Sequence, residues 1–477
     1  MAIIIPANSA AADTGYSIDN SCRFDGSSSY MTFTLGSETN RDRWTWSCWV
    51  KKCTNGETLD IMNIPQDDDN SQFFKFASDA LRHDTVVGNA TVGRLQTNRL
   101  FRDPSAWYHL VIVWDSANAT AGNRMRMYVN GVEETSFETD SNPSSGQDSW
   151  FYSGKVVNIG RDGRGTGLFD GYMAEIVFCD GQAYAASDFG EFNSDSPTIW
   201  QPKDVSGLTF GNNGFWLDFE DSSALGNDVS GNNNDFGVTN LAAVDQATDT
   251  PTNNFCTMNP LDNQIQGHTF SEGNNTIATT NASETYNTGT IGVTAGRWYF
   301  EVKLDDTTYS IRPTVGVVGA VSTNTGHYLG QQTASYGTSY NSDGNIRQTG
   351  LNISYGNTYT AGDIIGVFLD LTSNKIYFSK NGTIQNSGTG ISITAVTSTS
   401  AGAYFPAGGD RHSDDTIWHF NFGGGAFGGT AVSSAVADAN GYGNFEYDPS
   451  DGGGSSFDSA AKDFLAICTK NLGSDGG

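Results

Sequence analysis

The first chemistry that the sequence suggests is glycoside hydrolysis by a pair of carboxylates. Asp218 and Glu220 alternate in the run WLDFED, so both side chains point to one face of an extended strand. Retaining glycosidases place two such groups about 5–5.5 Å apart, on either side of the scissile bond. A third acid on this face would stand at position 222, which is Ser222. We therefore interpret both acids as solvated residues of an edge strand, and a glycan hydrolase is the weaker alternative.

Other catalytic arrangements are missing from the sequence. The nucleophile motif GxSxG does not occur, and no phosphate-binding glycine loop follows a strand. The six histidines show no spacing to a serine or cysteine that would indicate a nucleophile and its base. We therefore expect no catalytic residues and no enzymatic activity. The six cysteines lack zinc-ligand spacing and are expected to be buried free thiols.

The segment most typical of a ligand-binding surface is residues 323–359, where tyrosines stand among Ser, Gly, Asn and Thr. Tyrosine gives contact area at a small cost in entropy, while the small polar residues adapt their hydrogen bonds. The candidate ligand-binding residues are His327, Tyr328, Tyr336, Tyr340 and Arg347. The alternative, in which this segment caps the fold and binds nothing, stays open.

Strands must position these residues. Alternation in residues 44–50 (WTWSCWV) and 125–129 (MRMYV) is typical of strands, and no amphipathic helical pattern persists. Asn130-Gly131 and Asn381-Gly382 each separate two extended runs, which predicts type I′ hairpins. With 57 glycines and 11 prolines to interrupt regular elements, the chain is expected to be all-β.

Composition excludes several partners. Lys+Arg 25 against Asp+Glu 53 gives a net charge of −28, so the surface repels phosphate backbones and we expect no nucleic acid partner. No run approaches the ~18 apolar residues of a membrane span, so we expect no membrane insertion. The N-terminal run lacks a cationic region, and Pro6 ends its apolar start, so we expect no secretory signal peptide.

The first half of the chain resembles a laminin-G or concanavalin A-like lectin domain. The resemblance rests on residues 21–33 (SCRFDGSSSYMTF), 107–115 (WYHLVIVWD), 126–132 (RMYVNGV) and 158–180 (NIGRDGRGTGLFDGYMAEIVFCD). It implies a two-sheet jelly roll. Residues 215–235 resemble the opening of such a domain but here follow its last strand, which predicts a permuted edge strand at residues 215–219.

Laminin-G domains often hold one Ca²⁺ ion at the rim of a sheet, so the resemblance implies a calcium site here. The candidate ligands are Asp67, Asp69, Asp162 and Asp170. Acidic loops that face water are the alternative, because such charge runs are usually solvated. No other cofactor is expected.

The second half resembles a SPRY domain, which is another concanavalin A-like sandwich. The resemblance rests on residues 296–302 (GRWYFEV), 315–319 (VGVVG), 362–371 (GDIIGVFLDL), 376–382 (IYFSKNG), 404–407 (YFPA) and 421–423 (NFG). The expected fold class is all-β, with two concanavalin A-like antiparallel β-sandwiches (jelly rolls) in tandem. The expected divisions are an N-terminal tether (1–20), a first sandwich (21–245), a linker (246–262), a SPRY-like sandwich (263–430) and a glycine-rich C-terminal tail (431–477).

A lectin-like and a SPRY sandwich together in an acidic chain rich in Asn, Gly, Ser and Thr resemble virion appendage proteins of tailed bacteriophages. This resemblance implies a tail-fibre or capsid-surface protein of an extracellular particle. Such a protein would bind a host surface glycan or protein and contact other virion subunits, with a homo-oligomer as one arrangement open to it. A structural or decoration protein with subunit contacts alone is the alternative.

Overall fold

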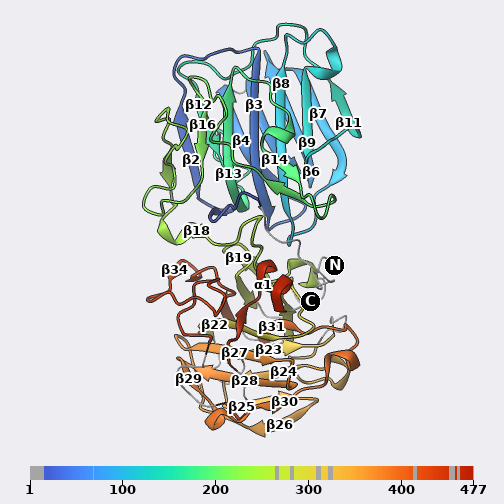
Figure 1. Cartoon of the computed structure of the whole chain (residues 1–477), viewed down its shortest axis with the longest axis vertical. Coiled ribbons are helices and arrows are strands. Elements are labelled where there is room, and N and C mark those ends of the chain that lie inside the picture. The colour runs from blue at the N-terminus through green and yellow to red at the C-terminus, as the bar shows by residue number, and fades with distance from the viewer. Residues whose placement is uncertain are drawn as a thin grey trace. The chain divides into compact units, whose positions relative to one another are not determined.

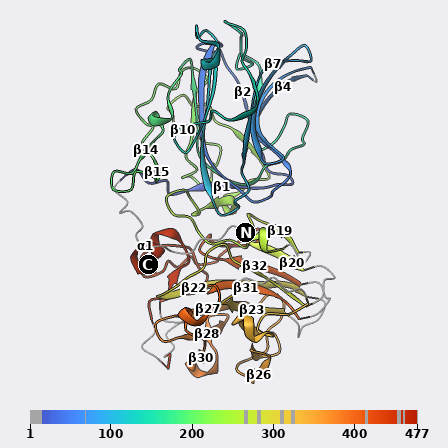
Figure 2. The same cartoon turned by 90° about the vertical axis from the view of Figure 1, so that its right-hand side faces the viewer.

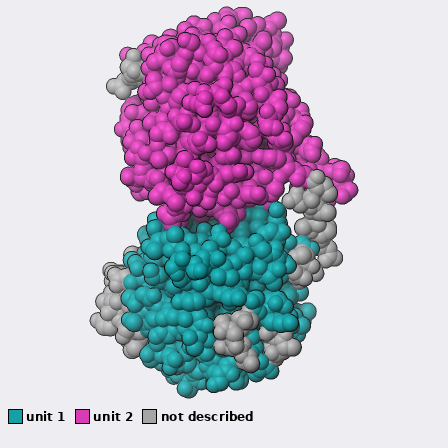
Figure 3. All heavy atoms as spheres, turned by 60° about the vertical axis from the view of Figure 1, so that its left-hand side comes forward, with its two compact units in different colours: residues 1–10, 253–477 teal, residues 11–252 magenta. Residues whose placement is uncertain are grey.

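The chain forms two compact units of β-structure (Figure 3). One unit is residues 11–252, the N-terminal sandwich; the other contains residues 253–477, the C-terminal sandwich, together with residues 1–10. The computed structural model describes residues 15–67, 69–263, 268–279, 284–307, 313–320, 326–411, 416–450, 457–458 and 462–475. The expected all-β class with two antiparallel β-sandwiches is confirmed.

The N-terminal sandwich consists of two facing sheets (Figure 2). The first, the β3 sheet, has the order β10-β9-β8-β3-β13-β1-β18, and β16 also pairs with β13. Its strands are β1 (Ser21–Asp25), β3 (Arg43–Lys52), β8 (Trp107–Asp115), β9 (Met125–Val129), β10 (Val132–Glu133), β13 (Asp170–Asp180), β16 (Phe215–Leu217) and β18 (Gln246–Ala247).

The second sheet, the β5 sheet, has the order β11-β7-β6-β5-β4-β12-β2-β17. Its strands are β2 (Tyr30–Thr34), β4 (Thr58–Asp67), β5 (Asn70–Ala77), β6 (Ala80–Val87), β7 (Ala90–Leu100), β11 (Phe137–Ser141), β12 (Val156–Ile159) and β17 (Gly237–Thr239). A separate hairpin pairs β14 (Gly190–Phe192) with β15 (Trp200–Pro202).

The C-terminal sandwich also has two main sheets (Figure 1). The β27 sheet contains β19 (Thr269–Ser271), β20 (Thr276–Thr279), β22 (Arg297–Thr307), β27 (Ile364–Asp370), β28 (Lys375–Lys380), β29 (Thr383–Ile384), β30 (Ile391–Ser392), β32 (Thr416–Asn421) and β35 (Leu465–Ala466). The β24 sheet contains β21 (Thr285–Thr288), β23 (Pro313–Val318), β24 (Thr338–Asn341), β25 (Asn345–Gln348), β26 (Leu351–Ser354) and β31 (Phe405–Asp410).

Short elements complete the fold. A two-stranded ribbon pairs β33 (Ala426–Phe427) with β34 (Thr430–Ala431), and the described residues hold one α-helix, α1 (Thr469–Asp475). The described 3₁₀ turns are η1 (Ala121–Asn123), η2 (Ala186–Asp188), η3 (Ala243–Asp245), η4 (Pro260–Asn263), η5 (Thr333–Ser335), η6 (Asn386–Gly388) and η7 (Val396–Ser398). None of these described helices is long and apolar enough to cross a membrane.

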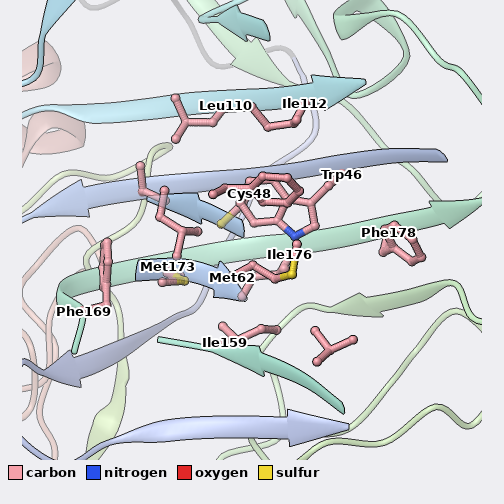
Figure 4. Packing of buried hydrophobic residues seen from close by; sticks show 14 of the residues in the cluster. Trp46, Cys48, Met62, Leu110, Ile112, Ile159, Phe169, Met173, Ile176 and Phe178 are labelled. Atoms are coloured by element: carbon pink, nitrogen blue, oxygen red, sulfur yellow. The ribbon is translucent and has the colours of Figure 1, made fainter. Parts of the chain in front are cut away.

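Alternation along the strands builds the cores. In β3, Trp46 and Cys48 point between the two sheets and pack with Leu110, Met62 and Ile176 (Figure 4). The opposite face of the β3 sheet is also buried, because residues 183–216 and the segment around Ile18 cover it. This second covered face explains why β3 is buried at every position after Arg43, including the polar residues on its outer face.

Two hairpin turns form as expected, and the permuted strand forms over Phe215–Leu217, shorter than the predicted 215–219 because Phe219 has a positive φ of 61°. Asn130 and Gly131 have φ of 49° and 77°, and Asn381 and Gly382 have φ of 48° and 75°, as a type I′ turn requires. The strand β16 pairs antiparallel with β13, so the segment after the last jelly-roll strand returns to the first sandwich. All six cysteines are free and buried, as predicted.

The predicted linker (246–262) contains the boundary between the two units, after Thr252, but its described residues pair with strands on both sides of that boundary. Gln246 and Ala247 pair with β1, and Asp249 accepts hydrogen bonds from Lys51 and from the Trp107 indole. Further on, Met258 forms a β-bridge with Gly289. The segment is therefore divided between the two sandwiches and built into both.

The described part of the predicted glycine-rich tail (431–477) is docked on the C-terminal sandwich. Strand β35 pairs with β22, and Phe445, Phe457 and Phe464 pack on the outer side of the β27 sheet. Of the predicted tether, residues 1–14 lie outside the described residues, while Ile18 is buried in the N-terminal sandwich. In the C-terminal segment, a Gly- and Ser-rich composition conceals a few well-spaced aromatic anchors.

Candidate functional site

Two of the five candidates in residues 323–359 are buried in strands, and the burial of Tyr340 in the core corrects the prediction that its ring faces a ligand. Tyr340 lies in β24 with its ring 5.4 Å from that of Phe378, and it is 0% exposed. Arg347 lies in β25 and is 4% exposed, with its guanidinium on Asp343 at 2.6 Å. Both positions belong to strands, so alternation places Tyr340 in the core instead of in a loop.

The other three candidates remain half-buried. His327 Nδ1 lies 2.9 Å from Oε1 of Gln331, and the Tyr328 ring lies under the guanidinium of Arg411 at 5.1 Å. Tyr336 ends η5 in the left-handed conformation with φ of 53°. The structure brings Tyr328 and Arg347 to one cluster through Arg411 and Asp343, and a ligand-binding role for these residues stays a prediction.

The calcium candidates do not converge in the described structure. Asp69 is exposed in the turn after β4, and the side chain of Asp67 lies outside the described residues. Burial alone would raise the pKa of Asp162, but donors from Thr166 and Arg164 lower it on balance. Asp170 accepts the hydroxyl of Thr54. No group of three His, Cys, Asp or Glu that could hold a metal is found in the described part of the chain.

The carboxylates Asp218 and Glu220 have a buried neighbour that sequence reasoning missed. Glu175 sits in a β-bulge of β13 with φ of 49°, and burial, followed by the charges of Asp218 and Glu220, raises its pKa to about 8. Its carboxyl oxygens accept the Trp216 indole N–H at 2.8 Å and the Tyr16 hydroxyl at 3.2 Å. Both oxygens are therefore occupied, and the group is only 7% exposed, which argues against a glycosidase pair.

A serine and a histidine approach each other under the N-terminal sandwich's outer layer. Ser47 Oγ lies 2.8 Å from Nε2 of His109, and the Trp200 indole donates to Nδ1 at 3.0 Å. Since Nδ1 accepts, the proton of the neutral ring is on Nε2, which donates to Ser47. Burial lowers the pKa of His109 to about 3. The pair cannot act as nucleophile and base, because the base nitrogen is already protonated.

The same contacts position Trp200 in a hollow of about 450 Å³. The hairpin of β14 and β15 carries it on the outer side of the β3 sheet, beside β10 (Figure 2). The Trp200 ring stacks on His109 at 5.9 Å and meets Phe192 edge-on at 4.9 Å. A Cβ on Gly131 would lie 2.3 Å from this ring. Glycine is therefore required here both for the positive φ of the type I′ turn and for the close approach of Trp200.

Polar groups surround this aromatic floor. The Tyr128 hydroxyl accepts from Nη1 of Arg126 at 3.1 Å, and Glu191 and Lys203 line the hollow with opposite charges. Phe192 is 43% exposed. Val132, which follows Gly131, and Ile199, which precedes Trp200, are exposed as well. An aromatic floor with a few convergent polar groups is the usual composition of a small-ligand or sugar site.

Sequence reasoning did not single out Trp200 or Phe192. They stand at the two ends of the seven-residue run NSDSPTI, which lacks the Asn-Gly signal of the other two hairpins. The pairing of Phe192 with Trp200 therefore has no comparable sequence signal. The contact of Trp200 with Gly131, 69 residues earlier in numbering, has no local signal.

Two family models match the chain. Residues 25–185 match the concanavalin A-like lectin/glucanases superfamily, and residues 297–423 match the SPRY domain. No curated protein matches the chain.

Three solved structures are similar to parts of this chain at low identity and low TM-score. A heptameric pentraxin from Limulus polyphemus is 20% identical and covers 35% of this chain and 78% of its own, with a TM-score of 0.28. The SPRY domain of human HERC1 is 18% identical and covers 34% of this chain and 96% of its own, with a TM-score of 0.26. Mouse laminin α1 LG4-5 is 11% identical and covers 87% and 84%, with a TM-score of 0.30.

Proposed function

We propose that this chain, in which a concanavalin A-like lectin domain is followed by a SPRY domain, is a non-enzymatic attachment protein that binds glycan in the Trp200 hollow. The observation that supports this most is the fixed Trp200 ring beside the exposed Phe192. His109 and Gly131 hold the ring in one place before any ligand arrives. A preorganised aromatic surface loses little entropy on binding.

The charges favour a neutral glycan. Glu191 and Lys203 offset each other at the rim, and the chain as a whole carries −28. An anionic sugar would be repelled by the overall field. A pyranose could lay its apolar face on the aromatic rings while its hydroxyls bond to Glu191, Lys203 and the Tyr128 hydroxyl.

We place this activity on the surface of a bacteriophage particle, as a tail-fibre or capsid-surface protein. The support is associational: the order of the two domains and the acidic, Asn- and Gly-rich composition. In that setting the SPRY domain, a type of domain that commonly mediates protein interactions, would bind a protein, either a virion subunit or a host surface protein.

The test is binding of the full chain to an array of neutral glycans and to host cells. Phe192→Ala removes an exposed ring without opening the core, so the fold is expected to persist. Loss of a good aromatic anchor costs about 2 kcal/mol or more, so binding should fall more than tenfold. Val238→Ala, which truncates an equally exposed apolar residue outside the hollow, is the matched control.

Full binding by the folded Phe192→Ala variant would exclude the hollow as the glycan site. Binding to cells that is lost in the Val238→Ala control as well would point to general surface adhesion. Particles that adsorb normally without this chain would favour a structural or decoration role.

A further inference from the structure

The C-terminal sandwich holds two arginines on a single carboxylate. Nη2 of Arg347 lies 2.6 Å and Nη1 of Arg411 lies 3.3 Å from the same oxygen, Oδ2 of Asp343. The other Lys and Arg ion pairs described in this sandwich each join one cation to one acid: Arg297–Asp370, Lys375–Asp458 and Lys380–Asp363. Among the ion pairs that the structure describes in this sandwich, the Asp343 group is therefore the one in which two cations share a single acid, a surplus of one positive charge by this pairing.

The N-terminal sandwich shows how one carboxylate can satisfy two guanidinium groups. Arg82 and Arg94 each donate from Nε and Nη2 to Asp84, which uses both of its oxygens. The Asp343 group lacks this arrangement. Nη1 of Arg347 and Nε of Arg411 are buried and have no hydrogen-bond partner. Unpaired buried donors are rare in native structures and indicate that a further acceptor completes the group.

The surplus charge lies on the outer face of the β24 sheet. Ile346 belongs to the core, so its neighbour Arg347 in β25 points to the opposite face. The side chains of Arg411 and Asp343 are 20% and 23% exposed, so these two side chains are partly open to solvent, whereas the two unpaired nitrogen atoms are buried. The Tyr328 ring lies 5.1 Å from the Arg411 guanidinium and supplies a flat wall beside it.

We infer that the Asp343 group binds a single carboxylate of a peptide, through Arg411 and Arg347. A planar carboxylate fits the guanidinium fork, and one surplus charge matches a monoanion. The net charge of −28 opposes a polyanion, so the ligand is an otherwise neutral peptide with one Asp or Glu. Tyr328 would pack against the methylene groups of that acidic side chain.

The experiment measures the affinity of the full chain for end-blocked peptides that carry one Glu and no other charged residue. Each is compared with a matched peptide that has Gln in place of Glu. We expect each Glu peptide that binds to have an affinity at least tenfold higher than that of its Gln partner. Arg411→Gln leaves a shorter polar side chain without the positive charge at this partly exposed position and should remove this preference. Arg94→Gln, at the satisfied Asp84 group, is the matched control and should retain it.

Absence of any Glu preference in the wild-type chain, or its survival in folded Arg411→Gln, would overturn the inference. Competition separates ligand classes: N-acetylglutamate amide should displace the peptide. Stronger displacement by glucuronate or inorganic phosphate would overturn the assignment to a peptide carboxylate. Arg347→Met tests the buried arginine and should also remove the preference for Glu. If Arg347→Met does not fold, Arg411→Gln alone decides between the outcomes. Glycan binding in the Trp200 hollow should be unchanged in Arg411→Gln, so the proposed function and this inference are tested independently.

Discussion

Trp200 donates its indole N–H to Nδ1 of His109 at 3.0 Å, and the two rings are stacked 25° from parallel. The hydrogen bond fixes the rotation of the indole ring, and it also fixes the histidine tautomer, so Nε2 of His109 donates to Ser47. One contact thus orients the floor of the proposed glycan site and prevents the Ser47–His109 pair from acting as a nucleophile and its base.

We predict that His109→Phe weakens glycan binding although His109 is buried and touches no ligand. Phenylalanine keeps a ring under Trp200 but cannot accept its N–H, so the indole gains freedom to rotate. Leaving the buried indole N–H unpaired costs about 1–3 kcal/mol of unfolding free energy. Urea unfolding and glycan titration should both report the change.

A matched variant separates orientation from stability. His83→Phe also replaces a buried histidine of the same sandwich, one whose pKa burial likewise lowers to about 3, but it lies in β6 away from the hollow. His83→Phe should lose stability and keep its affinity for glycan. Equal affinity in both variants would contradict a positioning role for His109.

The sequence predicts much of the local structure and little of the long-range pairing. The Asn130-Gly131 and Asn381-Gly382 turns are predictable, because positive φ at two successive residues is a local demand. The buried ion pair of Lys51 with Asp249 joins residues 198 positions apart, so the run around Asp249 reads as a polar linker. The Trp200 hollow could not be predicted from the sequence for the same reason, since its lining residues come from separate segments.

We predict that Tyr340→Ala destabilises the C-terminal sandwich by about 3–5 kcal/mol, the range for removing a buried aromatic ring. Tyr340 is in contact distance of Tyr355, Tyr359 and Phe378, so truncation leaves a cavity among aromatic rings. Tyr336→Ala, at a half-buried position of the same segment, should cost far less. Thermal unfolding of the two variants gives the comparison, and equal melting temperatures would contradict the burial of Tyr340.

We predict that the N-terminal sandwich loses stability as pH rises from about 4.5 to about 8 because of Glu175. Burial and the charges of Asp218 and Glu220 raise the folded-state pKa of Glu175 to about 8. In this window the folded state binds more protons than the unfolded state, so the free energy of unfolding falls with rising pH. Asp218→Asn with Glu220→Gln removes the repulsion and should reduce this dependence, while the larger effect of burial remains.

Denaturant unfolding at pH 5 and pH 8.5 measures the difference between the wild-type chain and the double variant. Asp221→Asn, which neutralises an exposed acid next to the group, is the control and should leave the slope as it is. We expect no reducing sugar from polysaccharide with either chain. Sugar release that vanished in the double variant would reverse the assignment of these acids.

The last prediction concerns Glu301, whose carboxylate connects β22 to the C-terminal segment. Its two oxygens accept the backbone N–H groups of Glu446 and Tyr447 at 2.9 and 2.7 Å. Beyond these contacts, Phe445, Phe457 and Phe464 cover Tyr299 and Phe368 on the β27 sheet. Burial of each such ring contributes about 1.5–3 kcal/mol, so this segment is required for the fold.

A fragment of residues 253–430 should therefore aggregate, whereas a fragment of residues 253–477 should remain monomeric in size-exclusion chromatography. Removing the segment exposes an aromatic sheet face and leaves Glu301 buried without two of its donors, and each effect alone favours association or unfolding. Glu301→Gln in the longer fragment isolates the second effect, because the amide cannot accept at both ends. A stable, monomeric 253–430 fragment would show that residues 431–477 are not required for the fold of the C-terminal sandwich.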